Sequence, residues 1–243
     1  MPQTSIPTPR GSTPAASIQK STIPNRPSIT GAYGLVSQIS PTRVRKIAKA
    51  IYQRLGTHNG IIHCFKVHDR STELALAKQG NLEQYILTHP AAPSVERRRL
   101  WIQELAEAFG HVHERRVVPQ DVALRNILVH NDSLKLCDFG DSVLLPLESD
   151  MACFSVGGGV TPQVEIARVG CVFYSVAVWR VFECHFDDGE GDDDDDGNGK
   201  VFSQTELLDV STDGGVLFAS AIEKCWGRGY ASMEALRREV LDS

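Results

Sequence analysis

Two short apolar runs, each bordered by oxygen-bearing side chains, constrain the fold of this chain most strongly. The first run is "ILV" at residues 127–129, and the second is "LKLC" at residues 134–137. Between them lies "HNDS", whose residue types are typical of a tight turn. The pattern predicts two short strands joined as a hairpin. The start of the first strand and the end of the second then lie side by side, at the open end (the mouth) of the hairpin.

Three polar side chains border these runs. Asp121 and Asn126 come before the first run, and Asp138 follows the second. Carboxylate and amide oxygens suit a hard cation such as Mg²⁺, which takes one or two protein carboxylates together with phosphate oxygens. A further carboxylate nearby can orient a hydroxyl nucleophile and accept its proton. Taken singly, each residue is better explained as a turn or a backbone cap. Jointly, the pattern D-x-x-x-x-N-x-L followed by K-L-x-D-F-G is hard to obtain by accident.

The remaining pattern predicts an α+β fold, with a small strand-rich lobe followed by a larger helical lobe. Residues 1–28 are rich in Pro, Ser and Thr and are interpreted as a disordered leader. A strand, turn and strand precede a helix over residues 47–56, and two strands follow over 60–69 and 71–77. The expected helices of the second lobe are a short one capped by Asn81, a long one capped by Ser94, a buried one over 164–182, and two separated by a turn at 227–229.

Composition excludes several function classes. The net charge of -5 provides no basic surface for nucleic acid or an anionic membrane as a main partner. No apolar stretch reaches the roughly 20 residues that a spanning helix needs, and the N-terminus lacks the apolar segment of a signal peptide. The six cysteines show no C-x-x-C pair and are expected to be reduced. We therefore expect a cytoplasmic protein, with the nucleus as the alternative, and a solvated acidic loop at 187–199.

Several stretches together resemble the protein kinases, and in particular the divergent protein-kinase-like domains common in filamentous fungi. They are "DVALRNILV", "LKLCDFG", "GNLEQYI", "HVHERRVV" and "IEKCWGRGYASMEAL". The resemblance implies a bilobal domain over residues 29–243, with an N-lobe at 29–77 and a C-lobe at 78–243. It also implies ATP- and Mg²⁺-dependent transfer of phosphate to a Ser, Thr or Tyr hydroxyl of a protein partner.

The resemblance assigns roles to the three polar residues and to one lysine. Asp121 takes the place of the catalytic Asp, while Asn126 and Asp138 take the places of the Mg²⁺ ligands. "TRVRKIAK" resembles the strand with the phosphate-binding lysine, which makes Lys46 the candidate; a solvent-facing lysine is the alternative.

The resemblance also predicts the nucleotide-binding backbone. "GAYGLV" is similar to a worn glycine-rich loop, in which Gly31 and Gly34 would let N–H groups approach the phosphates and Val36 would cover the adenine. An ordinary strand turn is the alternative for this segment. Ala75 and Ala77 would offer hinge backbone groups to the adenine.

Four departures from the pattern count against an active enzyme. Pro119 and Gln120 replace the usual His-Arg, so the loop lacks its brace and its partner for an activating phosphate. Ala48 stands where the lysine's ion-pairing Glu belongs, and the segment after residue 139 has no Ala-Pro-Glu anchor. Glu165 occupies the position of an Asp that braces the catalytic loop. We therefore expect a weak kinase or, alternatively, an inactive pseudokinase that serves as a nucleotide-binding or scaffolding module.

The acceptor stays open at the sequence level. Arg125 resembles the tyrosine-kinase loop, whereas Ala123 stands where serine/threonine kinases usually have a Lys. A small-molecule kinase of the aminoglycoside type also uses an Asp–Asn loop and is a third alternative. The "CDFG" and "GNLEQYI" stretches favour the protein-kinase branch.

Overall fold

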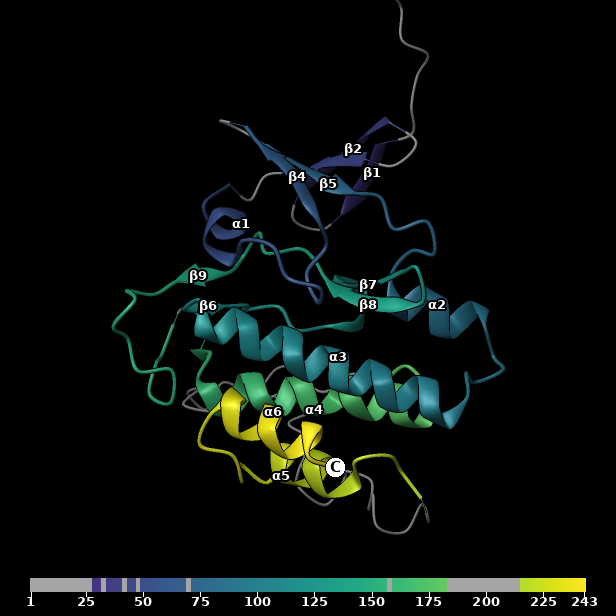
Figure 1. Cartoon of the computed structure of the whole chain (residues 1–243), viewed down its shortest axis with the longest axis vertical. Coiled ribbons are helices and arrows are strands. Elements are labelled where there is room, and N and C mark those ends of the chain that lie inside the picture. The colour runs from purple at the N-terminus through teal and green to yellow at the C-terminus, as the bar shows by residue number, and fades with distance from the viewer. Residues whose placement is uncertain are drawn as a thin grey trace, which may run out of the picture.

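The chain folds into a strand-rich lobe above a helical lobe (Figure 1). The computed structural model describes residues 28–31, 34–40, 43–46, 49–68, 71–156, 159–182 and 215–243. The predicted leader, up to its last residue, and the predicted acidic loop lie outside these described residues. The two-lobed α+β architecture expected from the sequence is confirmed.

The upper lobe is one antiparallel sheet of five strands. In sheet order these are β1 (Ser28–Gly31), β2 (Gly34–Ser40), β3 (Arg43–Lys46), β5 (Thr72–Ala75) and β4 (Cys64–Val67). The predicted strand over 60–69 is therefore shorter than expected, because residues 60–62 pair with the lower lobe instead.

Helix α1 (Lys49–Leu55) packs below this sheet. Ile51, Tyr52 and Leu55 are buried, as their helical spacing predicts. The helix ends at Gly56, whose φ of +65° is the left-handed conformation that glycine adopts without a Cβ penalty.

In the described part of the lower lobe there are five helices; Figure 1 shows how they are arranged. They are α2 (Leu82–Thr88), α3 (Val95–Glu114), α4 (Pro162–Val178), α5 (Ala219–Trp226) and α6 (Met233–Leu241). The predicted caps are present, since the side chain of Asn81 accepts a hydrogen bond from Gln84 N and that of Ser94 accepts one from Arg97 N. Helix α4 ends earlier than predicted because Trp179 turns left-handed, with φ of +55°, and its Nε1 donates to the carbonyl of His89.

Helix α4 is closely packed at the centre of the lower lobe. It is buried almost all round, and Gly170 faces α5 so closely that a Cβ there would lie 2.6 Å from the Cβ of Cys225. Because protein interiors are close-packed, such a contact fixes the two helices against each other. Helix α4 is therefore a rigid platform.

Three short elements went unpredicted. Strands β6 (Val117–Val118) and β9 (Val143–Leu144) pair with each other, and the 3₁₀ turn η1 (Leu124–Asn126) lies between β6 and the hairpin. Each is only two or three residues long, which is too short for a periodic pattern to show.

The described residues also bear on the expectations for the cysteines and for membrane-spanning helices. Four cysteines carry free thiols, at Cys64, Cys137, Cys153 and Cys225, but Cys171 is disulfide-bonded, so the expectation of reduced cysteines is wrong at that position. Among the described helices, none has the length and apolar character to cross a membrane.

Candidate active site

The predicted hairpin is present and carries the site. Strands β7 (Ile127–His130) and β8 (Ser133–Leu136) pair antiparallel, with Ile127 opposite Leu136. Asn131 and Asp132 form the turn with φ of +50° and +59°, a conformation that Asn and Asp tolerate better than most side chains. Pairing of 127 with 136 places the residues just before β7 beside those just after β8.

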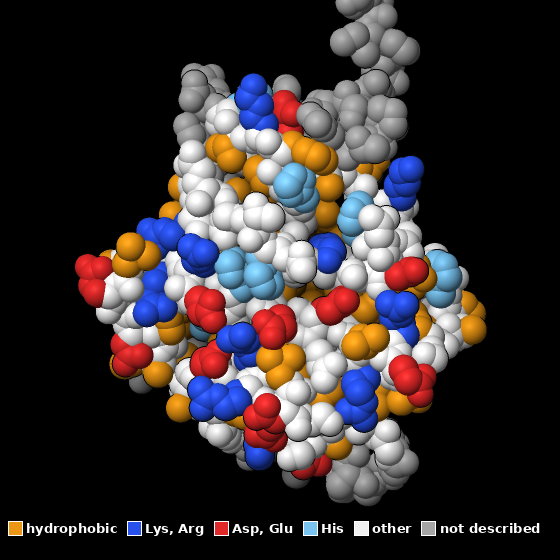
Figure 2. Space-filling model, in the orientation of Figure 1, with side chains coloured by type: hydrophobic (Ala, Val, Ile, Leu, Met, Phe, Trp, Pro, Cys, Tyr) orange, Lys and Arg blue, Asp and Glu red, His pale blue; other side chains and the backbone are white. Residues whose placement is uncertain are grey.

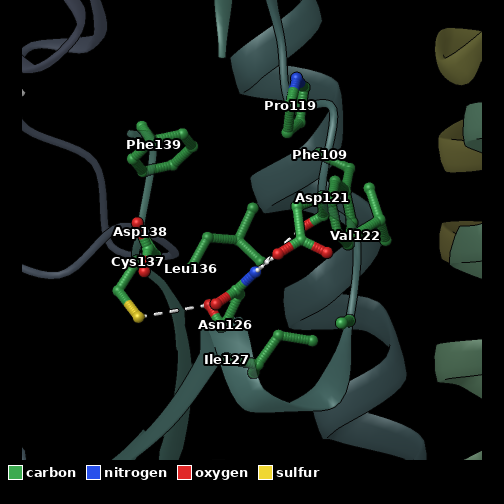
Figure 3. A pocket seen from close by; sticks show the side chains of 11 residues that line it. Phe109, Pro119, Asp121, Val122, Asn126, Ile127, Leu136, Cys137, Asp138 and Phe139 are labelled. Carbon is green, nitrogen blue, oxygen red and sulfur yellow. Dashed lines mark hydrogen bonds between the residues drawn. The ribbon is translucent and has the colours of Figure 1, made fainter. Parts of the chain in front are cut away.

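Asp121 and Asn126 are bonded to each other across η1 (Figure 3). The Asn126 side-chain amide donates to the Asp121 main-chain carbonyl at 2.9 Å and to its carboxylate Oδ2 at 2.8 Å. Since the amide nitrogen is used in this way, the amide oxygen is the atom that Asn126 can present to a cation.

Asp138 reaches the same place from the other strand. The Cys137 N–H donates to the Asn126 carbonyl at 3.0 Å, which fixes the residue before Asp138 against the loop. Asp138 itself has φ of +58°, a left-handed conformation that is uncommon outside glycine and clusters at functional sites. Its carboxylate Oδ1 accepts a long hydrogen bond of 3.4 Å from Gly140 N.

One small pocket joins the three polar side chains (Figure 3). Its lining residues are Phe109, Pro119, Asp121, Val122, Ala123, Asn126, Ile127, Leu136, Cys137, Asp138 and Phe139. The cavity volume is about 20 Å³, which suits a single ion or water and is far too small for a nucleotide. The side-chain oxygens of Asn126 and Asp138 are the kinds of donor that fit Mg²⁺.

Arg125 completes the surroundings of Asp121. Its guanidinium donates to Asp121 Oδ1 at 2.6 Å, so the two carboxylate oxygens are held by Arg125 and Asn126 separately. The Arg125 side chain is 45% exposed and that of Asp121 is 26% exposed, and ion pairs in such surroundings contribute little to stability. The contact therefore sets the direction of the carboxylate more than it stabilises the fold.

The residues of the upper lobe that are predicted to bind the phosphates and the adenine lie in the sheet. Gly31 ends β1 opposite Gly34, which begins β2, and Val36 lies opposite Ile29. Lys46 ends β3 opposite Thr72. The backbone thus places these four predicted residues on strands of the upper lobe, whereas the side chains of Val36 and Lys46 lie outside the described part of the chain.

The predicted hinge residues have bonded backbone groups. Ala75 N–H donates to the carbonyl of His63 at 2.8 Å, and the carbonyl of Ala77 accepts from Gly80 N at 3.3 Å. An adenine bound at these residues would have to compete for the N–H of Ala75 and for the carbonyl of Ala77. The assignment of Ala75 and Ala77 to adenine binding stays a prediction.

Glu165 contacts a side chain on α3. Its fully buried carboxylate Oε2 lies 2.9 Å from Nε2 of His113, which is also buried. The distance is that of an ion pair, while the angles fall outside those of a hydrogen bond. The pair joins α4 to α3.

Arg168 is the site residue that the sequence reasoning missed. Its NH1 donates to the main-chain carbonyl of Gln120 at 2.8 Å, one residue before Asp121. The loop that was expected to lack a brace is therefore tied to α4. A single arginine inside the apolar stretch "VEIARVGCVF" was the available signal.

Helix α1 also touches the site. The rings of Tyr52 and Phe139 meet edge to face, with centroids 5.6 Å apart, directly after Asp138. The helix contains no acidic residue, and Ala48 lies outside the described residues. A carboxylate partner for Lys46 is thus absent from the described part of α1.

A strand-rich lobe above a helical lobe, with an Asp–Asn loop and a second Asp at one hairpin mouth, is the arrangement typical of protein-kinase-like domains. Comparison with known proteins agrees. The family model described as the protein kinase domain matches residues 42–158. Over these residues the chain resembles the protein kinase superfamily.

Individual relatives match over part of their length. The serine/threonine-protein kinase Nek3 of Mus musculus is 32% identical over 93 residues, which are 33% of this chain and 18% of that protein. The MAPK/MAK/MRK overlapping kinase of Mus musculus is 28% identical over 51% of this chain and 34% of its own length. The calcium/calmodulin-dependent protein kinase kinase cmkC of Emericella nidulans is 30% identical over 44% of this chain and 22% of its own length. The chain thus spans about a third or less of these relatives.

Proposed function

We propose that this chain binds ATP with Mg²⁺ and transfers the γ-phosphate to a hydroxyl group of a protein. The observation that carries the proposal is the gathering of Asp121, Asn126 and Asp138 around one pocket. These residues come from both sides of a hairpin, and their types are those that phosphoryl transfer requires. The match of residues 42–158 to the protein kinase domain supports the same conclusion.

Each of the three polar residues of the pocket has a role in this proposal. Bound Mg·ATP supplies the phosphoryl group and the charge neutralisation that the transfer needs. Asn126 and Asp138 would hold the metal ion through their side-chain oxygens. Asp121 would orient the acceptor hydroxyl and accept its proton as the hydroxyl oxygen bonds the γ-phosphorus and the bond to ADP breaks.

A second candidate is an inactive pseudokinase that binds nucleotide or serves as a scaffold. Two observations favour it: α1 carries no acidic residue, and both Asp121 oxygens are engaged by Arg125 and Asn126. Phosphoryl transfer depends on alignment, so an unpaired Lys46 would lower the rate by several powers of ten. This candidate predicts nucleotide binding without turnover.

The test is phosphate incorporation by the full chain. Wild-type protein is incubated with Mg²⁺ and γ-labelled ATP together with peptide libraries that contain Ser, Thr or Tyr as the only acceptor. Asp138→Asn removes one charge at the pocket, and Asp141→Asn removes the same charge from an exposed position that does not line it. We expect transfer by wild type and Asp141→Asn, and none by Asp138→Asn.

Binding is measured separately, by the rise in melting temperature with Mg·ATP. A shift for wild type without incorporation above the Asp138→Asn background favours the pseudokinase. Equal incorporation by all three proteins overturns the proposal, because the signal then does not depend on the pocket.

A further inference from the structure

The loop that carries Asp121 has little regular structure of its own. It runs from the end of β6 to η1, and residues 119–123 lie in neither helix nor strand. Pro119 has no N–H to donate, so the loop needs ties from outside. Such a segment keeps its shape only if the surrounding structure holds it.

Arg168 provides such a tie. Its NH1 donates to the carbonyl of Gln120 at 2.8 Å across 48 residues of sequence. The acceptor is a main-chain atom, so the tie depends little on which side chain follows Pro119. A hydrogen bond from a charged donor is shorter and stronger than one between neutral groups.

The other end of the tie is rigid. Arg168 lies on α4, which is buried almost all round and is pressed against α5 at Gly170. Glu165, one turn earlier, meets His113 of α3 at 2.9 Å. Helix α4 is thus fixed against α5 and α3, and Arg168 extends from that platform to the loop.

We propose that Arg168 is a positioning residue that holds the catalytic loop from α4, in place of the side-chain brace that Pro119 and Gln120 lack. This inference rests on the proposed function for its effect on transfer, but the tie itself is tested without turnover. When the tie is lost, the Gln120 end of the loop loses its bond to α4, so the loop as a whole can shift. Asp121 stays bonded to Asn126, and Asn126 stays bonded through Cys137 to the hairpin.

The variants are Arg168→Ala, Arg168→Lys and a matched control, Arg97→Ala. Arg97 makes the same kind of contact, from its NH1 to the carbonyl of Asp132 at 3.1 Å, but it lies at the far turn of the hairpin. Lysine retains a charged donor without the planar fork of arginine, so it is expected to restore part of the effect.

The first readout is amide hydrogen exchange of the full chain. In Arg168→Ala, protection of peptides covering 117–126 should fall roughly ten- to hundred-fold, the size expected for one charge-assisted hydrogen bond. Arg168→Lys should recover part of this protection, and Arg97→Ala should affect only peptides near residue 132. Unchanged exchange at 117–126, or an equal loss throughout the chain, overturns the proposal.

The second readout is steady-state transfer. Since a displacement of about 1 Å can cost about 100-fold in rate, kcat should fall by that order in Arg168→Ala while KM for ATP stays near its wild-type value. If the wild type binds Mg·ATP without transferring phosphate, the proposed function is contradicted but the role of Arg168 is not. Amide hydrogen exchange at 117–126 then tests that role by itself. An active wild type whose kcat survives Arg168→Ala overturns the positioning role.

Discussion

The side chain of Asn126 closes a ring on Asp121, because one amide group donates to both the carbonyl and the carboxylate of the same residue. These two hydrogen bonds fix the backbone and the side chain of Asp121 together. The direction of the carboxylate is thus set before any substrate arrives, which is the kind of preorganisation on which catalysis depends.

Replacing Asn126 by Ala should loosen Asp121 and remove one oxygen ligand. We expect the free energy of unfolding to fall by about 1–3 kcal/mol, since one lost bond was made to a carboxylate. We also expect transfer to fall by at least about 100-fold. Urea denaturation and incorporation assays check the two effects, with Asn59→Ala, at an exposed position, as the control. Transfer that survives the change would remove Asn126 from the site.

Asp138 should tolerate Asn but not a β-branched residue. At φ of +58° Asn fits the left-handed backbone, whereas Val brings its Cβ substituents into conflict at a cost of about 1–2 kcal/mol. We expect Asp138→Asn to keep near wild-type stability and Asp138→Val to unfold at lower urea. Equal midpoints for the two variants would show that this backbone conformation carries no strain.

Gly170→Ala should destabilise the lower lobe by about 1–3 kcal/mol. The added Cβ would lie 2.6 Å from Cys225 Cβ and 3.2 Å from Trp226 Nε1, so α4 and α5 must separate. Ser220→Ala, on the exposed side of α5, should change the free energy of unfolding by less than about 0.5 kcal/mol. Chemical denaturation measures both. Similar values for the two variants would contradict the tight contact.

His58 should make stability depend on pH. Burial, followed by electrostatic repulsion from the neighbouring His111 and from Arg237, lowers the pKa of His58 below 6.5, while Glu107 and Glu114 oppose the shift. The two imidazole rings stack with centroids 4.1 Å apart. The unfolded chain then binds a proton more tightly than the folded chain, so the free energy of unfolding should fall as pH drops below about 6.5.

His58→Asn isolates this effect. Asn can still accept the hydrogen bond that Gly60 N now donates to Nδ1, but it does not titrate. The fall in stability between about pH 6.5 and 5 should therefore be smaller in the variant. Parallel pH profiles for the two proteins would assign the dependence to other groups.

Much of this fold follows from patterns that the sequence carries locally. Asn81 and Ser94 cap the helices that they were expected to cap, and the hairpin turn at 131–132 forms where "HNDS" predicts it. Such features depend on neighbouring residues, so a single sequence reveals them. The convergence of Asp121, Asn126 and Asp138 followed from the hairpin by the same reasoning.

Contacts between distant segments were not predictable in this way. The hydrogen bond from Arg168 to Gln120 spans 48 residues and depends on where α4 packs. The close contact of Glu165 with His113 likewise depends on the crossing of two helices. Periodicity shows which face of a helix is buried, but it does not show which neighbour a charged side chain on that face will meet.

The segment before β4 belongs mechanically to the lower lobe. Ile62 N–H donates to the carbonyl of Leu136, and Leu136 N–H donates to that of Gly60, so this segment runs beside β8 although it leads into the sheet. Any rotation of the sheet relative to the lower lobe would therefore have its hinge between Ile62 and β4. Helix α1 precedes this segment, so the segment also restrains the movement of α1 with the sheet. The amides of Ile62 and Leu136 should exchange late and together whether or not a nucleotide fills the space above them.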